Sequence, residues 1–175
     1  LPAGSIAGKM MLVRAMVLGW KLYLVPPSGR PLHQLDTVVD FVAMVPLQLY
    51  QSLEDLDQVS TILVGGGPIS AELRSLISGI RASLFESYGM TETASHVALR
   101  QLAPGAISPD PRSPLPPFQA LPGITFDQDE RGCLIVRAPY LPGEAIVTND
   151  LVEMVDKEHF RWLGRADNVV NSGGV

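Results

Sequence analysis

Cysteine and positive charge are both scarce in this sequence of 175 residues. Cys133 is the single cysteine, so an internal disulfide and a cysteine metal cluster are excluded, and a reducing, cytoplasmic compartment is the expected location. Lys and Arg together number 13 against 18 Asp and Glu, and the basic residues are scattered along the chain. This distribution does not indicate a surface for binding nucleic acid.

The sequence also lacks a long uninterrupted hydrophobic run. Its most apolar stretch, residues 6–25, is broken by three basic residues, so it does not have the apolar length that a membrane span requires. We expect a helix that begins at Ile6 and stops at Gly19, followed by a strand over residues 21–25. Because the chain starts without a methionine and stops without a closing element, we interpret it as a fragment.

Apolar residues make up 46% of the chain, enough for the core of a globular domain. Short β-rich runs cover residues 41–45, 61–64 and 82–85, while Pro46 and Ser70 are placed to begin helices between them. Strands that alternate with helices in this way predict an α/β fold with a layered, mostly parallel sheet.

The composition changes at residues 102–117, which contain six prolines and predict a linker or a surface loop. Short β runs separated by turns follow, and they predict a small antiparallel, β-barrel-like portion. We therefore divide the chain into an α/β subdomain (1–101), the Pro-rich linker (102–117), a small β subdomain (118–163) and a hinge segment (164–175).

The run Tyr88-Gly89-Met90-Thr91-Glu92 is the most informative part of the sequence. The aromatic ring can stack on a base, and the glycine lets the backbone approach a ligand closely. The hydroxyl of Thr91 can donate to a phosphate oxygen, and Glu92 offers the hard oxygen ligand that Mg²⁺ prefers. Five residues alone are a modest signal for a nucleotide site.

Three other segments indicate no function when each is taken alone, and they become informative only together with this run. Gly65-Gly66-Gly67-Pro68 follows an expected strand, and taken alone it is an ordinary strand-to-helix turn. Asp150 ends the run Thr148-Asn149-Asp150, where a lone aspartate is usually a solvated turn residue. Arg165 and Asp167 alone indicate no more than a surface ion pair.

In the order in which they occur, these segments resemble motifs of the adenylate-forming superfamily, which includes acyl-CoA synthetases, luciferases and peptide-synthetase adenylation domains. The run 88–92 resembles its Tyr-Gly-x-Thr-Glu motif. Residues 148–150 resemble its Thr-Gly-Asp motif, with Asn149 in place of the glycine. Residues 164–174 resemble its hinge motif, Gly-Arg-x-Asp followed by Gly-Gly. Residues 65–68 resemble its Gly-Gly-x-Pro turn.

The resemblance implies a role for each candidate residue. Thr91 would bind phosphate and Glu92 would hold Mg²⁺, which makes these two the candidate catalytic residues. Asp150 and Arg165 would bind the ribose, and Asp167 would be the hinge before a small C-terminal domain. The remaining nucleotide-binding residues would be Gly65, Gly66, Gly67, Pro68, Ser87, Tyr88, Gly89 and Met90, with the Tyr88 ring on adenine.

Longer stretches, at residues 6–11, 41–48, 91–100 and 160–165, resemble the o-succinylbenzoate:CoA ligases of menaquinone biosynthesis. This narrower resemblance implies that Ser95 and His96 face the acyl group and hydrogen-bond a polar dicarboxylate. Histidine is often partly buried without any function, so His96 as a packing residue stays an open alternative.

The activity implied is ATP-dependent activation of a carboxylic acid as acyl-AMP and its transfer to CoA, with ATP, Mg²⁺ and CoA as cofactors or co-substrates. The alternatives are a ligase for a fatty or aromatic acid, a carrier-protein adenylation domain, and a noncatalytic nucleotide-binding module. The superfamily's phosphate loop and catalytic lysine are not found in this sequence, so we expect the isolated fragment to be inactive. The expected partners are small molecules, and homo-oligomerisation is left open.

Overall fold

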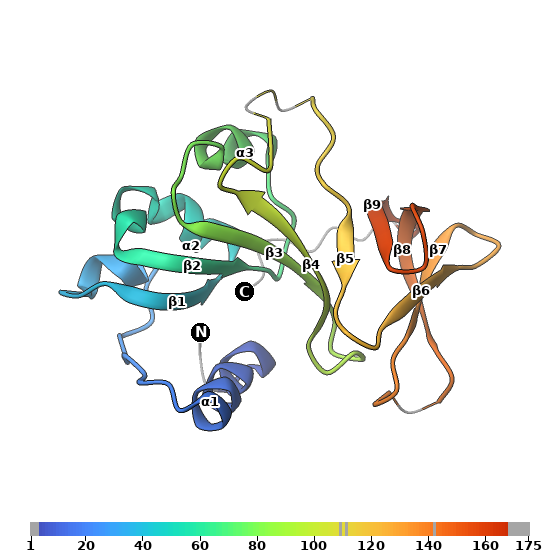
Figure 1. Cartoon of the computed structure of the whole chain (residues 1–175), viewed down its shortest axis with the longest axis horizontal. Helices are drawn as coiled ribbons and strands as arrows, with labels where there is room; N and C mark the ends of the chain where they lie inside the picture. The colour runs from blue at the N-terminus through green and yellow to red at the C-terminus, as the bar shows by residue number, and fades with distance from the viewer. Residues whose placement is uncertain (1–3, 109, 111, 142, 168–175) are drawn as a thin grey trace.

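The computed structural model describes residues 4–108, 110, 112–141 and 143–167. Its strands form one nine-stranded sheet in the order β1-β2-β3-β4-β5-β9-β8-β7-β6 (Figure 1). The α/β class is confirmed. The strands are β1 (Val39–Met44), β2 (Val59–Val64), β3 (Ser83–Gly89), β4 (His96–Ala103), β5 (Phe118–Ala120), β6 (Thr125–Gln128), β7 (Cys133–Arg137), β8 (Ile146–Met154) and β9 (His159–Arg165).

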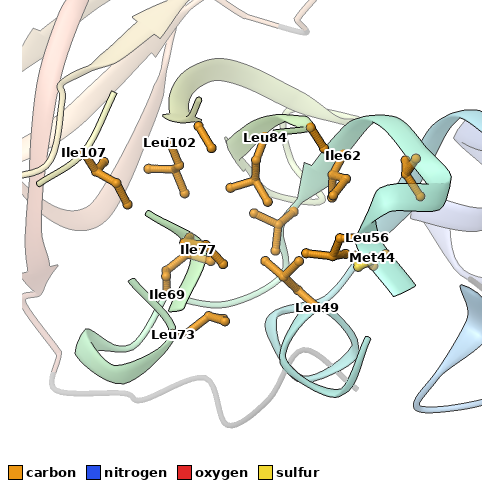
Figure 2. Close-up of a cluster of buried hydrophobic side chains, with 14 of the residues drawn as sticks. Met44, Leu49, Leu56, Ile62, Ile69, Leu73, Ile77, Leu84, Leu102 and Ile107 are labelled. Carbon is orange, nitrogen blue, oxygen red and sulfur yellow. The ribbon is translucent and has the colours of Figure 1, made fainter. Parts of the chain in front are cut away.

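Strands β1, β2 and β3 are parallel and are covered by short helices. Helix α2 (Pro46–Gln51) begins at its proline, and helix α3 (Ala71–Ile77) is capped by Ser70, whose Oγ accepts from the Leu73 amide at 3.1 Å. Two 3-10 helices, η1 (Pro31–Gln34) and η2 (Leu53–Gln58), lie in the connections. Figure 2 shows the core cluster that results, with side chains that include Met44, Leu49, Ile62, Leu73, Ile77 and Leu84.

Strand β4 is not among the predicted strands, and it pairs with β3 in the antiparallel sense. The mostly parallel arrangement is therefore limited to the first three strands. Leu102 and Ala103, which open the Pro-rich segment, are fully buried in β4. Strand β3 also extends to Gly89, so Tyr88 lies inside the strand and not after it. The predicted strand ends at residue 85 because polar residues follow. In the structure, Glu86 has Arg100 as its partner on β4, and Ser87 donates to the Val64 carbonyl on β2.

Helix α1 (Ile6–Leu18) forms as predicted: Ser5 caps its start, and Gly19 ends it with a left-handed φ of 66°. The strand predicted at residues 21–25 is wrong, because the structure has no regular element there. A strand needs a hydrogen-bonded neighbour, and β1 instead ends the sheet at this side. In Figure 1, α1 lies on the opposite side of β1–β3 from α2 and α3.

The remaining strands, β5 to β9, are all antiparallel and surround a second core cluster. The antiparallel portion was predicted correctly, but the sheet is not closed, so it is an open sheet and not a barrel. The sequence predicts two separate β runs at residues 145–148 and 151–155, and in the structure they form the single strand β8. The proposed division into segments stays a prediction. Among the residues that the structure describes, no helix has both the length and the apolar character to cross a membrane.

A buried ion pair joins β3 to β4. Glu86 is 5% exposed, and its carboxylate accepts from the Arg100 guanidinium at 2.7 Å. Burial raises the pKa of Glu86, while the charge of Arg100 acts in the opposite direction. The guanidinium of Arg100 also lies 4.2 Å from the ring centre of Phe118 on β5. Through Phe118, the ion pair therefore also contacts β5, the strand that joins β4 to the antiparallel strands β6–β9.

We expect Arg100→Met to lower the free energy of unfolding by at most about 3–5 kcal/mol, because the buried Glu86 carboxylate loses the Arg100 guanidinium and keeps the hydrogen bond from the Ile69 backbone and the charge of Arg74. Urea unfolding followed by circular dichroism measures the loss. Arg161→Met is the matched control, since its partner Glu153 is exposed and the loss there should be small. Adding Glu86→Gln to Arg100→Met should restore part of the stability. Equal losses for the two arginine variants would contradict the role of the buried pair.

Candidate active site

A buried carboxylate lies where β3, β8 and β9 come together. Asp150 is 7% exposed, and the Tyr88 hydroxyl donates to its Oδ2 at 2.6 Å. The indole Nε1 of Trp162 donates to Oδ1 of the same carboxylate at 3.1 Å. Burial is the main reason that the pKa of Tyr88 is raised, and the hydrogen bond to Asp150 adds to it. The phenol therefore stays protonated and able to donate at neutral pH.

A register shift explains how β9 delivers two side chains to one carboxylate. Val152 pairs with Trp162, whereas Asp150 pairs with Arg165, so β9 carries one more residue than β8 over this interval. Such an extra residue is a β-bulge, which turns a side chain toward the other face of a strand. Gly164 takes a φ of 149°, a conformation that side chains rarely allow. Arg165 thereby reaches to 3.8 Å from Asp150 Oδ1.

Arg165 also binds a second carboxylate. Its Nε and Nη2 donate to the two oxygens of Asp167 at 2.9 and 2.7 Å, a bidentate pair, and Asn149 Nδ2 donates to Asp167 at 3.3 Å. The structure thus brings the predicted residues Asp150, Arg165 and Asp167 together. Residues 168–174 of the predicted hinge motif lie outside the described residues.

The predicted glycine-rich turn lies beside the end of β3. Gly65 is next to Ser87, because a Cβ on Gly65 would overlap the Ser87 Oγ. That hydroxyl donates to the Val64 carbonyl at 3.2 Å, and Gly66 has a φ of 84°. The structure therefore brings two of the predicted segments together. The roles assigned to Gly65, Gly66, Gly67, Pro68 and Ser87 stay predictions.

The turn after β3 is organised by Thr93, a residue that the sequence analysis did not single out. Its side chain is 1% exposed; Oγ1 accepts from the Met90 amide at 3.0 Å and donates to the Ser95 carbonyl at 2.7 Å. Thr91 and Glu92 lie in this turn with exposed side chains. A threonine at the fourth position after a glycine is a weak signal, so only its contacts reveal the role.

Gly89 is required for a different reason. A Cβ at this position would overlap the backbone of Ser95 and His96, where β4 begins. The close approach of the two strands holds the turn with Thr91 and Glu92 at the end of β3. Glycine is needed here for space, because its φ is not in the left-handed region.

Arg14 is a second residue that the sequence analysis missed as a site candidate. Its Nη2 lies 3.3 Å from His96 Nδ1, and the Ser95 Oγ lies 3.2 Å from the same nitrogen. A guanidinium can only donate, so Nδ1 is the acceptor and the proton of a neutral ring is on Nε2. Burial lowers the pKa of His96, and the positive charge of Arg14 lowers it further. The only sequence signal for Arg14 was that a charged residue stands between Val13 and Ala15 in an otherwise apolar segment.

The described residues contain no group of three or more His, Cys, Asp or Glu side chains that could hold a metal ion. This does not argue against Mg²⁺, which commonly takes one or two protein carboxylates and completes its shell with water and substrate phosphates. An exposed carboxylate such as Glu92 fits that kind of site.

Comparison with known proteins gives the fold a class. A crystal structure from Dyadobacter fermentans DSM 18053, described as an acyl-CoA synthetase (AMP-forming)/AMP-acid ligase II-like protein, aligns with TM-score 0.82 and 45% identity. The alignment covers 100% of this chain and 50% of that one. No protein-family model matches the sequence. The fold is that of the AMP-forming acyl-CoA synthetases.

The chain is also similar to proteins named as o-succinylbenzoate:CoA ligases. A probable 2-succinylbenzoate–CoA ligase of Mycobacterium tuberculosis (strain H37Rv) is 26% identical over 200 residues, which cover 99% of this chain and 49% of that protein. An o-succinylbenzoate coenzyme A synthetase of Bacillus subtilis, solved in complex with ATP and magnesium ion, has TM-score 0.72 and 21% identity over 100% of this chain and 42% of its own. The predicted resemblance is therefore confirmed. The chain spans about half the length of the Mycobacterium relative.

We expect Gly89→Ala to destabilise the protein by about 1–3 kcal/mol, because the added methyl group must push the backbone of β4 away. Gly79→Ala is the matched control, since a Cβ there meets no atom within 4 Å. Thermal and urea unfolding measure both variants. If Gly89→Ala behaves like Gly79→Ala, then the tight approach of β3 and β4 does not exist in solution.

His96 should make stability depend on pH. Its pKa is lowered in the folded state, so the unfolded chain takes up the proton first, near the usual value of about 6.5. The contribution of His96 is therefore complete above that pH and is lost as the pH falls toward the folded pKa. We expect His96→Gln to have a shallower loss of stability between about pH 7 and pH 5 than the wild type.

The control for this experiment is Gln119→Asn, an exposed change that neither adds nor removes a titratable group. Urea unfolding at a series of pH values should give that variant the wild-type slope over the part of the range that His96 controls. Identical slopes for His96→Gln and the wild type would mean that His96 is not held neutral.

Proposed function

We propose that this chain is part of an ATP-dependent acid:CoA ligase that activates a carboxylic acid as acyl-AMP and transfers the acyl group to CoA. The observation that carries the proposal is the buried carboxylate of Asp150 on β8, which Tyr88 from β3 and Arg165 from β9 both approach. The Mycobacterium relative is named as such a ligase, and the Bacillus subtilis enzyme with the same fold was solved with ATP and magnesium ion.

The nucleotide would bind at the end of β3. Asp150 would accept hydrogen bonds from the ribose hydroxyls, and Arg165, 3.8 Å from that carboxylate, would donate to the same sugar. The ring of Tyr88 offers an aromatic face for adenine. In the turn at residues 65–68 the Ser87 hydroxyl fills the space beside Gly65, whereas the space beside Gly67 is open and would leave room for the base.

The phosphates would lie over the turn that Thr93 organises. Thr91 would donate its hydroxyl to a phosphate oxygen, and Glu92 would hold Mg²⁺. When bound, the ion would neutralise charge on the phosphates. The exposure of both side chains suits ligands that approach from solvent.

The reaction needs positioning more than acid or base catalysis by these residues. A carboxylate oxygen of the substrate attacks the α-phosphorus of ATP, the bond to pyrophosphate breaks, and acyl-AMP forms. A CoA sulfur then attacks the acyl carbonyl, and AMP leaves with the electron pair of the broken bond. The residues of this chain would hold the adenosine fixed during both displacements.

The favoured substrate is o-succinylbenzoate, and the alternative is another acid of an adenylate-forming ligase. Arg14, Ser95 and a neutral His96 form a cluster of hydrogen-bond donors beside the turn that carries Glu92. A dicarboxylate has a second carboxylate that is not activated, and a guanidinium is the side chain best suited to bind it. This cluster supports a substrate with two acid groups.

The test is acid-dependent exchange of pyrophosphate into ATP, with the protein expressed from the complete gene. We expect exchange with o-succinylbenzoate and weaker exchange with 4-phenyl-4-oxobutyrate, which lacks the ring carboxylate. Arg14→Met should raise KM for o-succinylbenzoate by about tenfold or more, the effect of losing a hydrogen bond to a charged group, and leave KM for the mono-acid unchanged. Lys9→Met, an exposed change on the same helix, is the control.

The outcomes separate the alternatives. Exchange with a fatty or aromatic acid but none with o-succinylbenzoate would reject the favoured substrate. Binding of ATP without exchange for any acid would favour a noncatalytic module. Glu92→Gln should lower exchange most strongly at limiting Mg²⁺, and unchanged exchange there would reject its role as a metal ligand.

A further inference from the structure

Both oxygens of Asp150 are already occupied by protein donors. Tyr88 donates to Oδ2 at 2.6 Å and Trp162 donates to Oδ1 at 3.1 Å. The carboxylate is almost fully buried, so a ligand hydroxyl that binds it must share or replace one of these donors. The question is which of the two hydrogen bonds gives way.

The two donors differ in what else they can do. The indole N–H can only donate, whereas a phenol can both donate and accept. Trp162 belongs to β9 and is paired with Val152, which fixes its backbone within the sheet. Tyr88 is the last residue but one of β3 and pairs with Ala98. A register shift follows both donors, after Tyr88 on β3 and after Trp162 on β9, so the difference between them is in the chemistry of their side chains.

The ring of Tyr88 has no face-to-face aromatic partner among the described residues. It packs edge-on against Phe160 at 5.1 Å and tilted against Phe118 at 5.8 Å, so its ring positions are set by edges and not by a face-to-face partner. The phenol is protonated and can therefore turn its hydrogen toward another acceptor without a change of charge.

We propose that Trp162 is the positioning residue that holds Asp150 for the ribose, and that the Tyr88 hydroxyl is a built-in substitute that a ribose hydroxyl displaces from Oδ2. This rests on the proposed function, because it assumes that the ligand is an adenosine nucleotide. Before binding, Tyr88 satisfies a buried acceptor that would otherwise be costly to leave unpaired. During binding, one hydrogen bond replaces another while Trp162 keeps the carboxylate in place.

The test compares AMP with 2′,3′-dideoxy-AMP by calorimetry, using the full chain. The wild type should prefer AMP. Trp162→Phe should weaken AMP binding about tenfold, roughly the effect of one lost hydrogen bond, and should abolish the preference, because a mispositioned Asp150 no longer recognises the hydroxyls. Trp20→Phe, the matched change at the other tryptophan, should keep both affinities. Tyr88→Phe should bind AMP more tightly, since it removes the competitor and keeps the ring.

Two results would overturn the inference. If Trp162→Phe weakened both nucleotides equally and kept the preference, its role would be packing alone. If Tyr88→Phe bound AMP more weakly than the wild type, the hydroxyl would be a contact and not a substitute. A wild-type protein that bound neither nucleotide would instead reject the proposed function, and with it the replacement of the Tyr88 hydrogen bond by a ribose hydroxyl.

Nuclear magnetic resonance of the two indole N–H groups judges the Trp162 contact without any nucleotide. Asp150→Ala should shift the Trp162 resonance and speed its exchange with solvent, while the Trp20 resonance stays in place. In the wild type, AMP should leave Trp162 protected. A Trp162 resonance that ignores Asp150→Ala, or that loses protection when AMP binds, contradicts the assignment of Trp162 as the fixed donor.

Discussion

The buried pair of Glu86 and Arg100 constrains the whole sheet. Two charges removed from water must lie together, so β3 and β4 have one acceptable register: a slip by one residue would turn the two side chains to opposite faces. The same pair reaches β5 through the contact of Arg100 with Phe118. Parallel and antiparallel halves are therefore joined by electrostatics as well as by backbone hydrogen bonds. Tyr88 stands two residues beyond Glu86, so the position of the nucleotide-site candidate is set by the same register.

A second constraint acts on β8 and β9. The extra residue in β9 allows Trp162 and Arg165 to approach one carboxylate, although a regular strand would turn residues three apart to opposite faces. Gly164 makes the irregularity tolerable. The two register features lie on different strand pairs, and the side chains that they place, Tyr88 on one pair and Trp162 and Arg165 on the other, all approach Asp150. The candidate site is thus a consequence of pairing geometry more than of any single motif.

Much of this could be predicted from the sequence, and the failures have physical causes. The helix that Ser70 caps was predicted because capping is local, and helix α1 because its apolar residues recur at helical spacing. The parallel strands were predicted because their apolar runs are continuous. Strand β4 was missed because its polar residue Arg100 is buried by a distant partner. Motifs located Tyr88 and Asp150 but not their hydrogen bond. Arg14 and Trp162 could not be assigned because each contacts a residue that only the fold brings near, whereas Thr93 binds Met90 and Ser95 within its own turn and has only a weak sequence signal.

The position of β9 has a consequence for how the chain folds. It is the last described strand in sequence, yet it lies between β5 and β8 inside the sheet (Figure 1). During synthesis, β6, β7 and β8 can pair with one another early, but they join β1–β5 only when β9 has emerged and inserted. Such long-range closure is slow compared with hairpin formation. Because β9 also carries Trp162 and Arg165, the site would be assembled in the same late step that unites the two halves of the sheet.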